Sequence, residues 1–299
     1  MLSRRFVLGA GAATLGLTAC GQGGVSAPAA VGARKLDKIG LQTYSLRNIF
    51  EDDPVGTLKM LKELGYDYVE LNGRNFAERD PKELISMVKD AGLYAPATHY
   101  GIEGIRDDFA KATKDAQALG VEYVIVPWIG EELRSIEGYK SVAALMNERG
   151  KQARGAGYKL AYHNHQFEFF DLGGGVTGMD ILLNETDPDV FDFELDLFWA
   201  KLELKDIPAF LKKYPGRFKL CHVKDMKGDP APWKNSVDFD SIKADLMVNV
   251  GEGDIPFEDY FALNDVSGLE YFVLEHDEPQ KPYRASMKQS IDAARAMRF

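Results

Sequence analysis

Polar side chains that can bind a metal ion end several of the most apolar segments of this chain. Residues 218–225 read FKLCHVKD, so His222 and Lys224 are two positions apart in an otherwise apolar run. Side chains of a β-strand alternate between its two faces, which puts His222 and Lys224 on one face and Cys221 on the other. A histidine and a lysine on a buried face are costly unless charged groups meet them. We therefore expect acidic partners from other segments.

Three other apolar segments end in side chains that could be these partners. They are FELD at 193–196, which ends in Asp196; FVLEHD at 272–277, which carries Glu275 and Asp277; and LAYHNH at 160–165, which carries His163 and His165. Two carboxylates and one or two imidazoles that converge suit a divalent ion such as Mn, Co, Mg, Fe, Ni or Zn. Without a metal, the same cluster would hold like charges close together, which is unfavourable. The pattern favours a divalent metal as cofactor.

The elements that must position these residues alternate along the chain. Segments rich in β-branched or aromatic residues are expected as strands at 39–44, 68–71, 95–99, 123–127, 159–165, 193–198, 218–223 and 271–275. Amphipathic stretches are expected as helices at 54–64, 81–91, 105–119, 136–156, 178–185, 207–214, 256–262 and 282–297. Eight βα units in about 260 residues predict a (β/α)8 TIM barrel, formed by residues 36–299 as a single domain. An open doubly wound sheet is the alternative, but the segment after the first strand, SLRN at 45–48, lacks a glycine-rich phosphate loop.

A barrel gathers its functional groups at the carboxyl ends of its strands. The polar residues expected at this rim are Gln42, Tyr44, Glu70, Asn72, His99, Trp128, His163, His165, Asp196, His222, Lys224, Glu275 and Asp277. Singly, each has an ordinary structural explanation: His99 could be a hydrogen-bonded core histidine, Lys224 could pair with Asp196, and Glu70 with Arg47. Their common position at one rim is what favours a functional site.

Several motifs resemble the xylose-isomerase-like barrels described as sugar phosphate isomerases or epimerases. They are YHNH at 162–165, ELD at 194–196, HVKD at 222–225, GEGD at 251–254 and Glu275. The resemblance implies a metal held by Asp196, His222 and Glu275, with a fourth ligand from the fifth strand. Many epimerases have a glutamate there that also acts as acid/base. This chain has His163, with Glu168 shortly after it, and we favour His163 as the ligand.

Such a metal would bind two neighbouring oxygens of a sugar and acidify the carbon-bound proton between them. Glu275, His165 and Glu168 are the candidate acid/bases, and Lys224 is expected to hold a substrate oxygen. The residues predicted to contact the substrate are Gln42, Tyr44, Glu70, His99, Trp128 and Trp199. We expect an isomerase or epimerase. The alternatives are a lyase or hydratase acting on an oxidised sugar such as a 3-keto-glycoside, and a sugar-binding protein without turnover.

Composition excludes some partners. The chain has 46 acidic and 36 basic residues, a formal charge of -10, and phosphate backbones are bound by clustered Lys and Arg. Nucleic acid is therefore not an expected partner, which also argues against the endonucleases of the wider barrel superfamily. The expected partner is a small-molecule sugar, and assembly into a homo-oligomer stays open.

Residues 1–33 are predicted to be an export signal and a flexible tether. Arg4 and Arg5 form a twin-arginine pattern before the apolar run at 9–19, and LTAC at 17–20 resembles a lipobox whose Cys20 would carry lipid. The run is shorter than the roughly 20 residues that span a bilayer. We expect twin-arginine export to the periplasm and membrane contact only through lipid at Cys20. Cys221 would then have no cysteine partner for an internal disulfide.

Overall fold

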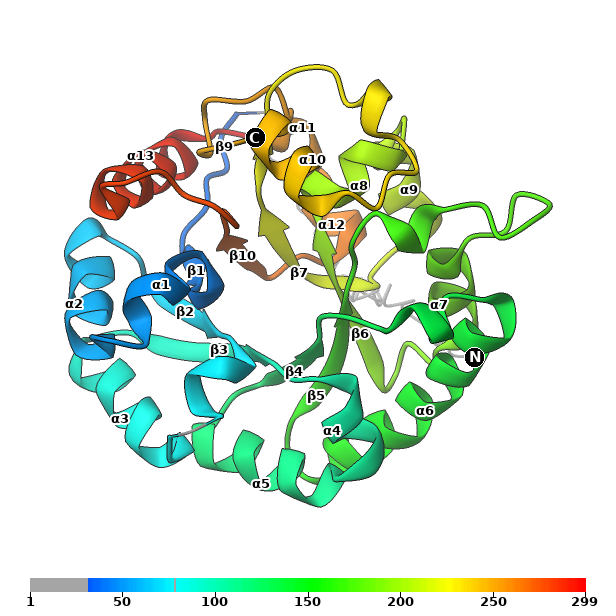
Figure 1. The fold of residues 1–299 in the computed structure, drawn as a ribbon, viewed down its shortest axis with the longest axis horizontal. Coiled ribbons are helices and arrows are strands. Elements are labelled where there is room, and N and C mark those ends of the chain that lie inside the picture. The colour runs from blue at the N-terminus through cyan, green and yellow to red at the C-terminus, as the bar shows by residue number, and fades with distance from the viewer. Residues whose placement is uncertain (1–31, 78) are drawn as a thin grey trace, which may run out of the picture. The chain divides into compact units, whose positions relative to one another are not determined.

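The barrel predicted from the sequence is confirmed by the computed structural model, which describes residues 32–77 and 79–299. Parallel strands close in the order β1-β10-β7-β6-β5-β4-β3-β2, with helices around them (Figure 1). The barrel strands are β1 (Gly40–Gln42), β2 (Tyr68–Leu71), β3 (Tyr94–His99), β4 (Tyr123–Val126), β5 (Lys159–His163), β6 (Phe191–Asp196), β7 (Phe218–Val223) and β10 (Tyr271–Leu274). The predicted export signal and Cys20 lie outside the described residues and stay predictions.

Helices follow most strands and cover the outside of the barrel (Figure 1). The α-helices are α1 (Arg47–Phe50), α2 (Pro54–Leu64), α3 (Pro81–Asp90), α4 (Ile102–Asp107), α5 (Phe109–Leu119), α6 (Ile136–Gly155), α7 (Gly178–Glu185), α8 (Leu197–Glu203), α9 (Ile207–Lys213), α10 (Phe239–Leu246), α11 (Phe257–Phe261), α12 (Asn264–Ser267) and α13 (Tyr283–Ala296). The 3-10 helices are η1 (Thr43–Leu46), η2 (Gly73–Phe76), η3 (Glu131–Leu133), η4 (Phe167–Phe169) and η5 (Ala231–Trp233). Within the described ranges, none of the helices has both the length and the apolarity needed to cross a membrane.

Local sequence signals set the ends of the outer helices. α2 starts at Pro54, where the Asp53 side chain accepts the amide hydrogen of Gly56 and the proline needs no donor of its own. It ends at Gly65, whose φ of 99° is open to glycine but strained for other residues. The expected helix at 105–119 is instead two helices, α4 and α5, because the Asp108 side chain accepts the amide hydrogen of Lys111 and starts α5 anew. Hydrophobic periodicity does not register such a cap.

Three strands end two residues earlier than the sequence suggested. After Gln42 the chain turns into η1, so Tyr44 is not part of the first strand. The fifth strand ends at His163, before His165. The sixth ends at Asp196, whose Oδ1 accepts the amide hydrogen of Trp199 at 3.0 Å and begins α8. The first and sixth strands therefore end at residues whose side chains cap the helix that follows, Gln42 and Asp196.

A small antiparallel sheet outside the barrel, β8 (Asp225–Met226) with β9 (Met247–Val248), was not expected. The Asp225 carboxylate accepts amide hydrogens from Gly251 at 2.9 Å and Gly253 at 3.0 Å. The HVKD and GEGD motifs therefore meet in a backbone clamp that fixes the chain beyond β7. In this part of their sequence the two motifs have a structural role.

The lower part of the barrel is filled by apolar side chains. Ala97, Ala161 and Leu220 each stand two positions before an inward-facing histidine, and with Tyr123 and Ile125 they form an apolar cluster separate from the main core. The polar side chains follow toward the carboxyl ends of the strands, as the alternation predicts. Cys221 points the other way and belongs to the core between strands and helices, as expected.

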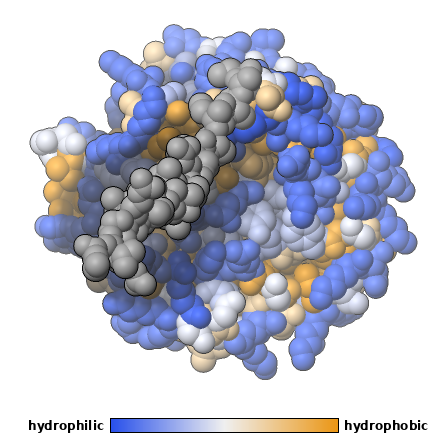
Figure 2. Space-filling model, turned by 180° about the vertical axis from the view of Figure 1, so that it is seen from behind, coloured by the Kyte–Doolittle hydropathy of each residue, from blue (hydrophilic) through white to orange (hydrophobic). Residues whose placement is uncertain are grey.

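The face opposite to the viewer of Figure 1 is covered mainly by hydrophilic residues, with hydrophobic ones visible in separate patches between them (Figure 2). Large hydrophobic side chains that are exposed in the described residues are few, and Trp128, at 39% exposure, is one of them. Because Trp128 follows β4 at the carboxyl end, its exposure directs attention to that rim of the barrel.

Candidate metal and substrate site

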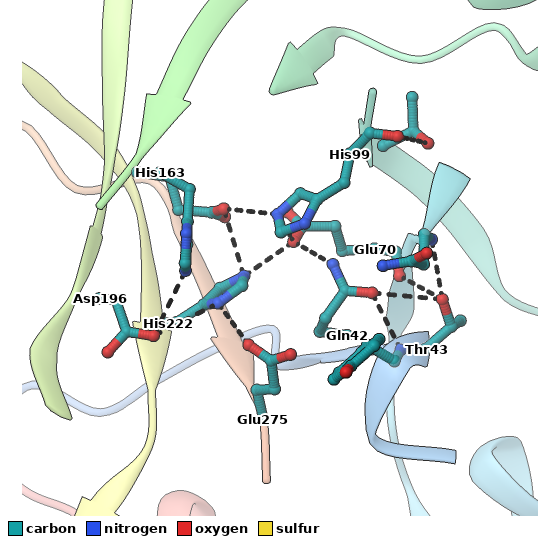
Figure 3. Close-up of polar contacts among 12 residues, drawn as sticks. Gln42, Thr43, Glu70, His99, His163, Asp196, His222 and Glu275 are labelled. Carbon is teal, nitrogen blue, oxygen red and sulfur yellow. Dashed lines mark hydrogen bonds and ion pairs between the residues drawn. The ribbon is translucent and has the colours of Figure 1, made fainter. Parts of the chain in front are cut away.

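Four side chains that the sequence proposed as ligands come together at the carboxyl end of the barrel. His163, Asp196, His222 and Glu275, here called the outer group, place one ligand atom each within 4.8 Å of one another (Figure 3). His163 Nε2 lies 3.3 Å from Asp196 Oδ2, and His222 Nδ1 lies 2.6 Å from Glu275 Oε2. All four are buried. Register explains the meeting, since Asp196 of β6 lies beside His222 of β7.

The residues of the outer group fit a divalent ion. Although His222 Nδ1 is buried and close to Glu275, it makes no hydrogen bond, and neither does His163 Nδ1. Close approach of a nitrogen and a carboxylate without hydrogen-bond geometry is what two ligands of one ion would show. Two imidazoles and two carboxylates suit Zn, Mn, Co, Fe or Ni. The outer group can therefore hold the predicted cofactor.

Lys224 lies against the same carboxylate oxygens. Its Nζ is 3.1 Å from Asp196 Oδ2, 2.9 Å from Glu275 Oε2 and 3.0 Å from Asp277 Oδ1. Burial alone lowers the pKa of the lysine, but Asp196, Asp277 and Glu275 outweigh it and raise the pKa well above its ordinary value. Lys224 is thus protonated at neutral pH and shares two oxygens with the outer group. The structural pairing with Asp196 that the sequence allowed is present, and the expected contact with substrate stays a prediction.

A second group of potential ligands lies on the inner side of His222. Glu70, His99, Glu194 and His222, here called the inner group, also place one ligand atom each within 4.8 Å of one another. Figure 3 labels three of them, Glu70, His99 and His222. Burial alone lowers the pKa of His99, but Glu70 and Glu194 raise it to about 9. Glu194 was not among the predicted site residues. Its signal was present, because it stands two positions before Asp196 on the same face of the strand.

A cavity of about 430 Å³ opens above the outer group. The predicted site residues that line it are Tyr44, His99, Trp128, His163, His165, Trp199, Lys224 and Glu275. Gln42 and Glu70 do not line the cavity, so the structure does not support their predicted contact with the substrate. Gln42 Nε2 instead donates a hydrogen bond of 2.6 Å to Glu70 Oε1. Arg47 is not the partner of Glu70 and pairs with Glu278.

Glu168 is neither a ligand nor part of the cavity wall. One of its oxygens accepts the Tyr162 hydroxyl at 2.5 Å and the other accepts the amide hydrogen of His165 at 2.8 Å. Burial raises its pKa to about 7, against hydrogen bonds that lower it. These contacts give Glu168 a positioning role, because it fixes the turn that carries His165. Its predicted acid/base role stays a prediction. Of the two candidates for the fourth ligand, the geometry favours His163.

Replacing Glu168 with glutamine is expected to change how stability depends on pH. A folded-state pKa of about 7, above the ordinary 4.5, means that stability present at low pH is lost as pH rises through 7. The free energy of unfolding of the wild type, relative to Glu168→Gln, should fall by about 3 kcal/mol between pH 4.5 and pH 8. Urea unfolding across this range measures the difference. Glu132→Gln, an exposed control, should follow the wild type, and parallel curves for Glu168→Gln would contradict the assignment.

One wall of the cavity is aromatic. The Trp128 ring meets His165 and Phe167 edge-on, each with centroids 4.9 Å apart, and Phe239 at 5.4 Å. Burial, then the nearby His163, lowers the pKa of His165 well below its ordinary value, so this imidazole is neutral at pH 7. The wall offers a flat apolar surface and a neutral base, opposite the charged groups around Lys224.

Phe239 and Lys243, on α10, are cavity residues that the sequence analysis missed. Phe239, Ile242 and Leu246 repeat at the spacing of one helical face, and this was the available signal. Arg74, from η2 after β2, also lines the cavity and was missed as a site residue. All three lie on helices outside the barrel strands, so strand alternation could not find them.

The chain matches the xylose isomerase-like TIM barrels over residues 58–297. It belongs to that family. An inosose dehydratase of Mesomycoplasma hyopneumoniae is 24% identical over 269 residues, which cover 79% of this chain and 86% of that protein. An inosose dehydratase of Clostridium tetani is 29% identical over 156 residues, and this match spans only half of each chain. A sugar phosphate isomerase/epimerase from Parabacteroides distasonis has a TM-score of 0.67 and 26% identity, with 90% of this chain and 96% of that one covered.

Proposed function

We propose that this family member is a divalent-metal-dependent lyase that eliminates water or an alcohol from a keto-sugar or keto-cyclitol. The observation that carries the proposal is the pair formed by Glu275 and Lys224 at the cavity surface, a carboxylate and an ammonium 2.9 Å apart. A base and an acid on one side of a substrate suit removal of a proton and a leaving group from the same face. The similarity to inosose dehydratases supports the same reaction class.

The residues of the chain have separate roles in this proposal. A divalent ion in the outer group would polarise the carbonyl and lower the pKa of the neighbouring C–H. Glu275 takes that proton, a carbon–carbon double bond forms, and the C–O bond on the next carbon breaks. Lys224 gives its proton to the departing oxygen. The products are an unsaturated ketone and water or an alcohol. A proton passed from Glu275 back to Lys224 restores both groups.

The wall around Trp128 would exclude water and support one face of the ring. Tyr44 and Arg74 stand on the other side of the cavity opening, with the Arg74 guanidinium 5.7 Å from the centre of the Tyr44 ring. Aromatic faces with a few polar groups are typical of small-molecule sites. The arrangement suits a hydroxylated ring of one or two sugar units in a cavity of about 430 Å³.

Isomerisation or epimerisation, the first expectation from the sequence, is the second candidate. It needs a proton returned to another carbon or to the opposite face of the same carbon. The neutral His165 on the opposite wall favours this outcome, as does the similarity to the Parabacteroides distasonis protein. With His163 in place of a carboxylate, the opposite wall offers only imidazoles as bases, and this is why we rank elimination first.

The reaction can be tested with keto-sugars, 3-keto-glycosides and keto-cyclitols in D2O with added Mn or Co. We expect release of a β-leaving group and an unsaturated ketone, seen by NMR and ultraviolet absorption. Glu275→Gln should abolish the signal. Deuterium incorporated into an intact, rearranged sugar would show the isomerase instead. Substrate binding without deuterium exchange or product, at any metal loading, would favour the remaining alternative, a sugar-binding protein without turnover.

A further inference from the structure

We propose that the inner group, Glu70, His99, Glu194 and His222, is a second metal site and that His222 bridges the two ions. His99 Nε2 lies 3.0 Å from Glu70 Oε1 and 3.0 Å from Glu194 Oε2. His222 Nε2 lies 2.8 Å and 3.2 Å from the same two oxygens. Two nitrogens and two oxygens therefore surround one point, and each nitrogen faces both oxygens.

The spacing fits ligands around a small ion, as it also fits the hydrogen bonds that join His99 to Glu194 and His222 to Glu70. Four ligands about 2.0 Å from a tetrahedral zinc lie about 3.3 Å from one another. The four nitrogen–oxygen distances of the inner group, from 2.8 to 3.2 Å, are close to this value. A ring nitrogen has one in-plane direction for a proton or a lone pair. For His99 this direction meets Glu194 Oε2, with which Nε2 forms a hydrogen bond, while Glu70 Oε1 lies equally far from the same nitrogen, at 3.0 Å.

The inner group is buried, and its carboxylates are hydrogen-bonded at the oxygens that face the histidines but not at their second oxygens. Glu70, Glu194 and His222 are completely buried and His99 is 6% exposed. Glu70 Oε2 and Glu194 Oε1 have no hydrogen-bond partner, although both atoms are buried. Two carboxylates deep in a barrel need two positive charges. Either two protonated imidazoles, those of His99 and His222, or one divalent ion supplies both charges. Gln42, by donating to Glu70 Oε1, holds one ligand in place.

His222 connects the two groups through its two nitrogens. Nε2 faces Glu70 and Glu194, whereas Nδ1 faces Glu275 at 2.6 Å and Asp196 at 3.7 Å. An imidazole that binds an ion at each nitrogen has lost its proton and is a stronger donor to both. With four protein ligands, the inner ion has no open position for substrate, which is typical of structural zinc. Its role would be to hold His222 in place and to keep it deprotonated, so that Nδ1 can bind the outer ion.

Metal content of the full chain tests the proposal independently of any reaction. After removal of metal and reloading with Zn, the wild type should hold two ions per chain by mass spectrometry. Glu194→Gln, which keeps the size of the side chain, and His99→Ala should each hold one. His163→Ala, which removes only an outer ligand, should also hold one. His276→Asn, a buried histidine outside both groups, should keep two. Reloading with Co should show two absorption envelopes, of which Glu194→Gln and His163→Ala each lose a different one.

The outcomes separate the two sites. If the wild type holds one ion, and Glu194→Gln and His99→Ala retain it while His163→Ala loses it, the inner site is overturned. The proposed reaction is then unaffected. If the wild type holds one ion that Glu194→Gln loses and His163→Ala retains, the inner site is supported. The outer metal, on which the proposed reaction rests, is then overturned. No bound ion after reloading would overturn both. If His99→Ala does not fold, Glu194→Gln and the Co spectrum of the wild type decide alone.

Discussion

Replacing Lys224 with methionine should lower the free energy of unfolding of the metal-free protein by about 3–5 kcal/mol, because it leaves buried carboxylates without their partner. Three acidic side chains contact the Lys224 ammonium within 3.1 Å, and all of them are buried. Methionine keeps the length of the apolar stem, so lost packing contributes little. Urea unfolding of the metal-free variant measures the loss.

The same substitution should raise the affinity of the outer group for a divalent ion at least tenfold. Lys224 and the ion share Asp196 Oδ2 and Glu275 Oε2, so removing one cation favours the other. Added Zn should then restore much of the lost stability, since a ligand of the folded state stabilises it. Lys219→Met is the matched control: Lys219 is on the same strand but pairs with Glu270 at the surface, where such a pair is worth at most about 1 kcal/mol. Unchanged stability and unchanged Zn affinity in Lys224→Met would contradict the shared-oxygen arrangement.

Replacing His222 with alanine should reduce kcat/KM by about 1000-fold or more, because this side chain contacts both groups of ligands. The variant should also hold no tightly bound ion, which sets it apart from variants that remove one ligand of one group. Metal analysis and turnover of the best substrate from the panel measure the two effects. Circular dichroism verifies the fold.

His276→Asn is the control for His222→Ala. His276 is also a buried histidine, and its Nδ1 accepts the amide hydrogen of Glu278, a role that asparagine can take over. Its turnover should stay within a few-fold of the wild type. A His222→Ala variant with turnover within tenfold of the wild type would remove the metal from the mechanism altogether.

Strand alternation predicted much of the site. It placed His222 and Lys224 on one face and brought His163, Asp196 and Glu275 to the same rim, because side chains two apart on parallel strands point the same way. These placements depended only on the order of residues within each strand. The structure then added the distances and the contacts of the lysine.

Alternation says which face a side chain is on and says nothing of its height in the barrel. Height depends on the stagger between neighbouring strands, which closure of the barrel imposes and no single segment encodes. Gln42 pairs in register with Glu70, and neither lines the cavity, although Gln42 ends its strand and Glu70 is next to the last residue of its own. Glu194 pairs with His163 across β5 and β6, which placed a further carboxylate in the interior. Cap positions such as Asp108 and Asp196 were missed for a similar reason: they act through one hydrogen bond and leave no periodic trace.

The segment that carries α10 connects the two halves of the β8–β9 clamp. The clamp fixes both ends of the segment independently of the barrel strands, since Asp225 binds the amides of Gly251 and Gly253. Phe239 and Lys243 project from this segment into the cavity wall. Changes in its sequence or length can therefore alter which molecule is accepted while the ligand groups stay in place. A protein built this way can acquire new substrates through changes in the segment that carries α10, and it can keep the same chemistry through many such changes.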